Sequence, residues 1–219
     1  MKDFVIVGAG GHSRETRWLV NDINKEISDP YNFIGYVVSD LDSLGKNDSK
    51  NEVVGDFSFF DENRNDISVV IGIGNPVVRI KLSELLISKY SNLNFPNLIH
   101  PSVEYDHSSS KFGKGIMICA NTVLTVNVIL GDFVVINYLC AIGHEAVIGR
   151  GSVINPSTAI SGGVNIGKGT LIGSGSKIIQ YTNIGDYSVL GSGSVAINDI
   201  PSNSLAVGIP AKVKKVING

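Results

Sequence analysis

Cysteine, histidine, aromatic residues and surplus charge are all scarce in this chain. Its 219 residues include 2 Cys, 4 His and 1 Trp, and 18 basic residues against 20 acidic ones give a formal net charge of −2. Without a basic surplus, we expect no nucleic-acid partner. No apolar run approaches the roughly 18 residues of a membrane span. The apolar stretch at residues 4–7 is too short for a signal peptide, which predicts a cytoplasmic protein.

The chain does have a strict six-residue repeat. From Phe112 to Ala196 every sixth residue is apolar, without a slip in the count. A helix repeats about every 3.6 residues and a simple strand about every 2, so neither explains this period. A coil of three short strands and three turns does, and the repeat then forms about five coils. The apolar positions are Phe112, Ile118, Leu124, Leu130, Ile136, Ile142, Ile148, Ile154, Ile160, Ile166, Ile172, Ile178, Ile184, Leu190 and Ala196.

Other positions of the hexad indicate limited space inside the coil. Small or β-branched residues stand two places before the apolar one, as at Thr122, Ser152 and Val164, and they suit an inward-facing strand position. Glycine or asparagine often follows the apolar residue, and we expect these residues to supply the backbone angles of tight corners. Cys119 and Cys140 lie inside the repeat and are predicted to be reduced and buried.

Residues 1–100 lack this period and alternate between strand and helix patterns. Strands are predicted at 4–7, 33–38, 68–73 and 97–99, helices at about 13–24 and 76–89, and an exposed loop at 43–51. The alternation predicts a small Rossmann-like parallel α/β domain over residues 1–105. An all-β domain of hexapeptide repeats with a C-terminal cap follows over residues 106–219, with a hinge at Ser108–Ser110.

Three predicted strand ends face one crevice at the carboxyl edge of the sheet, where parallel sheets bind ligands. They are Gly8–His12, Ser39–Asp40 and Gly74–Asn75. The Gly8-x-Gly10 turn before a helix suits a phosphate. Ser13 replaces the third glycine of a dinucleotide fingerprint, which favours a ligand smaller than NAD. A plain strand-to-helix turn and a solvated Asp40 are equally consistent with these residues alone.

His144 and Glu145 stand out in a repeat with few charges, and His144 is the only histidine between residues 112 and 196. A neutral imidazole can take a proton from a hydroxyl or an amine, and a neighbouring carboxylate can orient the ring. Adding 18 residues places Gly162 one coil above, where an amide without a side chain can stabilise an oxyanion. A surface histidine without a role and a plain turn glycine pair are the alternatives.

Four segments resemble, in order, the sugar acyltransferases of the sialic acid O-acetyltransferase and nucleotide-4-aminosugar N-acetyltransferase group, the NeuD/PglD-like family. They are Val5–His12, Ile73–Asn75 with Arg79, Leu98–Ser102 and Val207–Lys212. The resemblance extends over essentially the full length. It implies a left-handed parallel β-helix, a handedness that physical rules alone do not predict.

The resemblance also implies a function. We expect an acetyl-CoA-dependent N-acetyltransferase acting on the 4-amino group of a nucleotide-linked 4-amino-4,6-dideoxy sugar, for a bacterial surface glycan or O-antigen. His144 would be the general base, with Glu145 beside it, and the amine would attack the thioester directly. The enzyme would be a homotrimer with active sites between subunits. Expected acetyl-CoA contacts are Gly162, Ser174 and Ser192, with Lys212, Lys214 and Lys215 near the CoA phosphates. Expected nucleotide-sugar contacts are Gly10, Gly11, His12, Asp40 and Asn75.

Three other functions share parts of this sequence pattern. An O-acetyltransferase acting on sialic acid or a related sugar shares every motif, because amine and hydroxyl acceptors need a base at the same place. The nucleotide-binding crevice favours the nucleotide-linked acceptor. A trimeric scaffold without catalysis needs no His–Glu pair. A carbonic anhydrase-like metal site needs several histidines at coil spacing, but those positions hold Val126, Gly162 and Gln180. We therefore predict no metal.

Overall fold

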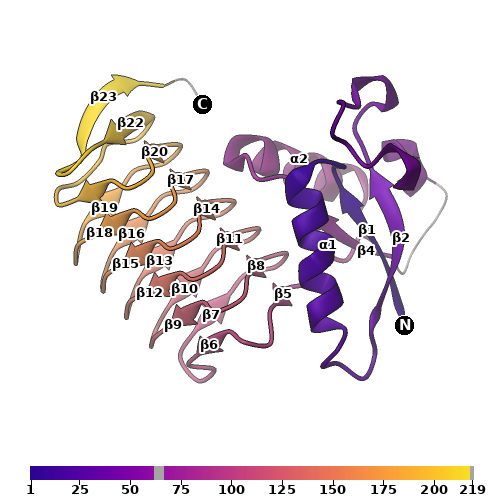
Figure 1. Ribbon diagram of the computed structural model, residues 1–219, viewed down its shortest axis with the longest axis horizontal. Helices are drawn as coiled ribbons and strands as arrows, with labels where there is room; N and C mark the ends of the chain where they lie inside the picture. Colours follow the sequence, from indigo (N-terminus) through magenta and orange to yellow (C-terminus); the bar gives the residue numbers. More distant parts are fainter. Residues whose placement is uncertain (62–66, 218–219) are drawn as a thin grey trace.

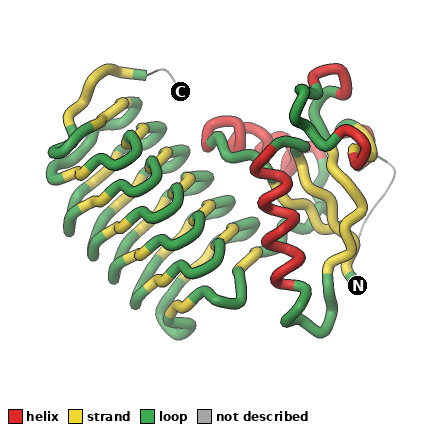
Figure 2. Tube along the Cα trace, viewed as in Figure 1, coloured by secondary structure: helices red, strands yellow, loops and turns green. Residues whose placement is uncertain are grey.

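The computed structural model contains an α/β domain and a long stack of short strands that lie side by side (Figure 1). The structure describes residues 1–61 and 67–217. Both long helices belong to the first domain, whereas the stack consists of strands and turns (Figure 2). The predicted fold class, a Rossmann-like parallel sheet followed by an all-β domain, is confirmed. No helix within the described residues is long and apolar enough to cross a membrane.

The first domain has a four-stranded parallel sheet in the order β3-β2-β1-β4. Strand β1 lies inside this sheet, and its last four residues, Phe4–Val7, are apolar and buried, as expected for a strand that is covered on both faces. The elements are β1 (Lys2–Val7), α1 (Gly11–Ile23), β2 (Tyr31–Val37), β3 (Val53–Gly55), β4 (Ser68–Ile71) and α2 (Pro76–Lys89). Short 3₁₀ helices span Leu41–Ser43, Lys50–Glu52 and Phe57–Phe60.

Helix α1 begins at Gly11, two residues before the predicted start. Gly10 is extended and forms the N-cap, so Ser13 lies in the first turn. Its Oγ donates a hydrogen bond of 2.9 Å to the carbonyl oxygen of Gly72. The serine that departs from the dinucleotide fingerprint therefore ties the start of α1 to the end of β4.

The second domain is a parallel β-helix with three walls, and each strand pairs with its equivalent in the next coil, as β13 does with β16. Wall 1 contains β5 (Leu98–Ile99), β8 (Met117–Ile118), β11 (Val135–Ile136), β14 (Val153–Ile154), β17 (Leu171–Ile172), β20 (Val189–Leu190), β22 (Ser204–Val207) and the antiparallel β23 (Lys212–Val216). Wall 2 contains β6 (Glu104–Tyr105), β9 (Val123–Leu124), β12 (Ala141–Ile142), β15 (Ala159–Ile160), β18 (Lys177–Ile178) and β21 (Val195–Ala196). Wall 3 contains β7 (Lys111–Phe112), β10 (Ile129–Leu130), β13 (Val147–Ile148), β16 (Asn165–Ile166) and β19 (Asn183–Ile184).

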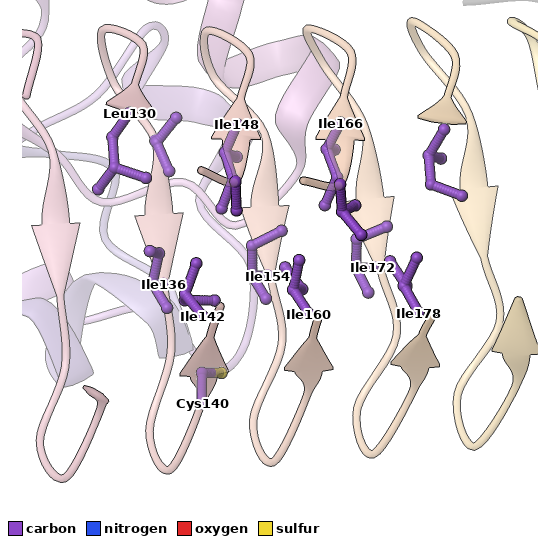
Figure 3. Packing of buried hydrophobic residues seen from close by; sticks show 14 of the residues in the cluster. Leu130, Ile136, Cys140, Ile142, Ile148, Ile154, Ile160, Ile166, Ile172 and Ile178 are labelled. Carbon is purple, nitrogen blue, oxygen red and sulfur yellow. The ribbon is translucent and has the colours of Figure 1, made fainter. Parts of the chain in front are cut away.

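The predicted hexad positions form the interior of the β-helix. All but Phe112 are buried, and Phe112 packs against the same cluster. Residues 18 apart lie in rows along the stack, as Ile136, Ile154 and Ile172 do in Figure 3. Both cysteines are free and buried, as predicted. Burying an isoleucine side chain contributes roughly 1.5–3 kcal/mol, so these rows dominate the stability of the domain.

The corners between the walls are built differently from the prediction. We call the turn from wall 1 to wall 2 corner 1, from wall 2 to wall 3 corner 2, and from wall 3 to wall 1 corner 3. The left-handed residue is the third after the apolar position, as in Phe133 (φ 60°) and Tyr181 (φ 60°). The glycines directly after the apolar residue serve close approach instead: a Cβ on Gly149 would lie 2.5 Å from the Lys168 nitrogen in the next coil.

The stack begins before residue 106, the predicted start of the second domain. Strand β5, predicted as the last strand of the first half, pairs with β8 in wall 1 rather than with the α/β sheet. The Ser108–Ser110 segment, predicted as a hinge, lies within corner 2 of the first coil, where Ser109 Oγ accepts a hydrogen bond of 2.7 Å from the Asn127 amide. Pairs here are 19 residues apart, as in Glu104 with Val123, because this corner holds one extra residue.

The α/β domain rests on wall 1. The outward side chains of Met117, Val135 and Val153 are buried in one cluster with Leu19 and Val20 of α1. These outward positions are apolar because a protein surface, not water, covers them. The contact sets the carboxyl edge of the sheet beside the β-helix.

Candidate active site

His144 and Glu145 lie on corner 2, between β12 and β13. Glu145 is the left-handed residue of this corner, with φ 61°. Both side chains face outward, with exposed fractions of 43% for His144 and 60% for Glu145. Glu145 Oε2 lies 3.7 Å from His144 Nδ1, which is too long for a hydrogen bond. The carboxylate thus stands on the Nδ1 side of the ring.

Gly162 lies against the opposite edge of this ring, one coil further along. A Cβ atom on Gly162 would be 2.3 Å from both Nε2 and Cε1 of His144. The ring therefore occupies the space that any side chain at position 162 would need. The Gly163 amide donates a hydrogen bond of 2.8 Å to the His144 carbonyl oxygen, which fixes the two coils at this corner. The Gly162 amide donates to no oxygen within residues 1–61 and 67–217, so the residue that contacts the ring keeps an N–H without a partner in the described chain.

Exposed apolar side chains adjoin the His144 corner. Val126 occupies the same corner position one coil earlier and is 46% exposed, while Val123 on wall 2 and Ile129 on wall 3 are 46% and 41% exposed. Together they form an apolar strip next to the imidazole. Such a strip is suited to contact with another molecule or another subunit.

The glycine turn after β1 lies under a loop. The loop at residues 43–51, predicted to be exposed, is exposed at residues 45–47 and 50–51. It also folds back over the turn, where the Ser49 amide donates a 3.0 Å hydrogen bond to the Ala9 carbonyl oxygen. Arg14 Nη1 donates a 2.7 Å hydrogen bond to the Asn47 carbonyl oxygen. A Cβ on Gly10 would lie 3.6 Å from the Asp48 carboxylate. The Asp48 charge faces the Gly10 side of the turn, which leaves the Gly11 side better suited to a phosphate.

His12 lies in the same crevice and is largely buried. Burial, and secondly the charge of Arg79, lower the pKa of His12 to about 4. Its Nδ1 lies 3.5 Å from Glu15 Oε2, and its buried Nε2 has no hydrogen-bond partner within the described part of the chain. The ring is therefore neutral at pH 7, with one nitrogen free for a ligand.

The His12 crevice opens at corner 1 of the β-helix. His12, Glu15 and Thr16 of α1 line a small cavity with Asn137 and Tyr138 of corner 1. The exposed Trp18 ring stacks on Tyr138 at a centroid distance of 5.8 Å. His144, however, lies at the far end of wall 2, on corner 2. Tyr138 and His144 lie on successive corners, so one protomer holds the crevice and the imidazole on separate corners.

Asp40 and Asn75 lie at the ends of β2 and β4, as predicted, and both side chains cap local structure. Asp40 accepts a hydrogen bond of 2.9 Å from the Asp42 amide. Asn75 accepts hydrogen bonds of 3.0 and 3.1 Å from the first turn of α2, as N-cap residues do. Their positions agree with the predicted crevice, and their caps give each a structural role as well.

The remaining predicted residues are separated from His144 within one chain. Ser174 and Ser192 lie on corner 1, in successive coils. Lys212, Lys214 and Lys215 lie on the exposed strand β23 at the end of the stack. Gly162 alone among the predicted acetyl-CoA residues lies beside His144.

Asp48, Asn137 and Tyr138 also lie around the crevice, and none of the three was predicted from the sequence. Asn137 and Tyr138 lie on corner 1, next to the contact between the two domains. Two polar side chains at such a position could have indicated a binding site. Asp48 gave no signal, because its position depends on how the loop folds. No group of three or more His, Cys, Asp or Glu side chains within the described ranges could hold a metal ion.

Comparisons with known proteins agree with this architecture. Residues 3–86 match the PglD N-terminal domain family. PerB from Caulobacter crescentus, solved in complex with CoA and GDP-perosamine, is 25% identical, with a TM-score of 0.85 and coverage of 98% of both chains. The acetyltransferase domain of PglB from Neisseria gonorrhoeae, in complex with acetyl coenzyme A, is 25% identical, with a TM-score of 0.84 and coverage of 97% of this chain and 99% of that one.

WeeI from Acinetobacter baumannii is also 25% identical, with a TM-score of 0.82 and coverage of 98% of this chain and 100% of its own. A search of curated proteins finds no significant match. The similarity to solved structures runs through both domains, and it confirms the predicted left-handed β-helix.

Proposed function

The chain is a sugar acetyltransferase of the NeuD/PglD-like family, and on this premise we propose that it acetylates the 4-amino group of a nucleotide-linked 4-amino-4,6-dideoxy sugar. Acetyl-CoA is the donor, in line with the ligands of similar structures. The product would serve a bacterial surface glycan such as an O-antigen. Residues 1–105 would hold the nucleotide-sugar and residues 106–219 the donor and the base.

The observation that carries this proposal is the His144 ring lying against the backbone of Gly162. In our mechanism, the sugar amine attacks the thioester carbonyl carbon, and His144 Nε2 takes one amine proton. The Gly162 amide donates to the oxyanion of the tetrahedral adduct. When the adduct collapses, the C–S bond breaks and the CoA thiolate takes the proton back from the imidazolium. Glu145, on the Nδ1 side, favours the ring orientation that presents Nε2.

We further propose that the enzyme is a homotrimer whose active sites lie between subunits. The crevice with His12 lies on corner 1, and His144 lies on corner 2 of the same chain. A three-fold arrangement that sets corner 1 of one copy against corner 2 of the next would join them. The same arrangement would bring Ser174 and Ser192 alongside a neighbour's His144 and Gly162, forming a groove for acetyl-CoA, with the lysines of β23 near its phosphates. It would also cover the apolar strip around Val126.

An amine acceptor is favoured over a hydroxyl by the GDP-perosamine in a similar structure. Gly10, Gly11, His12, Asp40 and Asn75 form the proposed nucleotide-sugar site. The neutral His12 ring can form a hydrogen bond with the sugar without repelling an ammonium group.

The test is acetyl-CoA turnover, followed by thiol release, with UDP-, dTDP- and GDP-linked 4-aminosugars and free sialic acid. We expect one nucleotide-linked aminosugar to be acetylated and His144→Ala to lose about 10²–10⁴-fold in rate. His107→Ala, which removes another corner 2 histidine two coils away, is the matched control and should change the rate less than about twofold. Turnover of sialic acid alone would instead identify an O-acetyltransferase. Binding of acetyl-CoA without turnover of any acceptor would refute the proposed acceptor class.

A further inference from the structure

Arg79 on α2 is the largest fully buried side chain of the described residues, with no exposed surface. No carboxylate in the described part of the chain forms an ion pair with it, and burial lowers the pKa of its guanidinium to about 9. An unpaired charge is costly to bury and persists only where hydrogen bonds replace water. The hydrogen bonds of Arg79 must therefore stabilise this buried charge.

The guanidinium joins the two domains through four carbonyl groups. Nε donates a hydrogen bond of 2.6 Å to Phe133 O, and Nη2 reaches Gly115 O at 3.5 Å. These are left-handed residues of corner 3 in successive coils. On its other side, Nη1 donates to Ile71 O and, at 3.3 Å, to Ile73 O, at the carboxyl end of β4.

The end of β4 leads directly into the proposed nucleotide-sugar site. Gly74 lies against His12, since a Cβ there would be 3.6 Å from His12 Cγ. The planar fork of one arginine thus spans from the β-helix to the backbone that supports His12. Lysine has no such fork and cannot bond four divergent carbonyls.

Arg79 also affects the charge of His12. The titratable groups around His12 are Glu15 on its own helix, Arg79 on α2, and Cys119 and Tyr138 on the β-helix. Burial and the Arg79 charge both disfavour the imidazolium, while Glu15 favours it. With Arg79 in place, the ring stays neutral throughout the physiological range.

We propose that Arg79 is a positioning residue for the acceptor: it fixes the edge of the nucleotide-sugar domain on the β-helix and, through the backbone that leads from β4 to Gly74, holds His12 in place for the sugar. This inference rests on the proposed function and adds to it a residue that does not contact the substrate. It predicts that loss of Arg79 weakens acceptor binding selectively, while donor binding is retained.

Two substitutions separate the effect of the Arg79 hydrogen bonds from the effect of its charge. Arg79→Lys keeps the charge and removes the fork, so we expect KM and Kd for the nucleotide aminosugar to rise about tenfold, about 1.4 kcal/mol. The pKa of His12, measured by NMR titration, should stay low. Arg79→Met removes both, so acceptor binding should weaken and the pKa of His12 should rise toward its ordinary value. The KM for acetyl-CoA should change less than about twofold in both.

Arg150→Lys is the matched control, because Arg150 also bridges the domains, through Ser83 at 2.9 Å and Glu84 at 3.6 Å, but does not touch β4. It should leave the acceptor KM and the pKa of His12 as in the native enzyme. Equal weakening of donor and acceptor, or native acceptor binding in Arg79→Lys, would overturn the proposal. If Arg79→Met does not fold, Arg79→Lys still decides.

If the proposed function itself is wrong, the experiments give a different result. A native enzyme that acetylates no member of the panel would remove the acceptor readout. The His12 titration would then still test the charge effect, and an unchanged His12 pKa in Arg79→Met would overturn it.

Discussion

At corner 2 the His144 ring lies so close to Gly162 that one added carbon atom would displace it. We expect Gly162→Ala to reduce kcat by about 10²-fold, because the new methyl group would displace the His144 ring by an ångström or more. Stability should change little, since the obstructing atoms are the end of a side chain that can swing outward. Steady-state kinetics and thermal unfolding test both statements.

A double variant sharpens this prediction. Because Gly162→Ala acts through the His144 ring, adding it to His144→Ala should cause little further loss of rate. Full additivity of the two effects would mean that Gly162 matters for another reason.

His12 gives the protein a dependence of stability on pH. Its pKa is about 4 in the folded protein and about 6.5 when exposed, so the unfolded chain binds more protons between these values. Unfolding free energy should therefore fall as pH decreases from 6.5 to 4, by up to about 3 kcal/mol from this residue. Denaturant titrations of the native chain and His12→Asn check this, and the difference between them should vary with pH only in that window. Parallel curves would contradict the buried neutral ring.

Among residues, the spacing of the repeat made His144 and Gly162 predictable as neighbours, because 18 residues separate equivalent points on successive coils. Arg79 and Asp48 were different. Arg79 belongs to a segment that resembles the family, but its surroundings, like those of Asp48, come from chain segments distant in sequence, which no period or motif specifies.

At the scale of elements, two kinds of glycine support the coils for different reasons. A Cβ on Gly149 would overlap backbone atoms of the next coil, at 2.5 Å from Lys168 N and 2.6 Å from Gly167 C, whereas a Cβ on Gly193 would meet nothing within 4 Å. Gly193 instead has φ 68°.

We therefore expect Gly149→Ala to cost about 3 kcal/mol by forcing two coils apart, and Gly193→Ala about 1 kcal/mol from the left-handed backbone alone. Urea unfolding at one fixed protein concentration compares them. A larger loss for Gly193→Ala would show that corner angles, rather than coil spacing, limit the fold.

Element positions followed from the sequence where a period or a cap was present. The rows of isoleucines and the start of α2 at Pro76 belong to this class. The sheet to which β5 belongs could not be predicted from the sequence, because a strand of two residues does not indicate which strand it pairs with. Left-handed corners at Phe133 and Tyr181 were also unpredictable from propensity, since tertiary packing of the coils imposes them.

At the scale of the whole molecule, the separation of the His12 crevice from His144 leads to a complementation test. Chains carrying His12→Ala and chains carrying His144→Ala should each be inactive. Mixed by unfolding and refolding together, they should recover up to about a quarter of native activity, because that share of the interfaces would pair an intact crevice with an intact base. Light scattering should give the mass of a trimer.

The control mixes either variant with itself under the same protocol, and it should stay inactive. Absence of recovery in mixed oligomers of the right mass would mean that each chain builds its own site, contrary to the proposed arrangement between subunits.

The extra residue in the first corner 2, at Asp106–Ser110, has a consequence for how such a chain can diverge. Within a strand, inserting one residue would turn every later side chain from the interior to the surface. The β-helix can therefore grow only by the addition of whole coils. At a corner the added residue is absorbed locally, as the 19-residue spacing beside an unbroken 18-residue one demonstrates. Lineages with this architecture can thus lengthen their corners to remodel what surrounds a ligand, and leave the ladder of coils beneath it untouched.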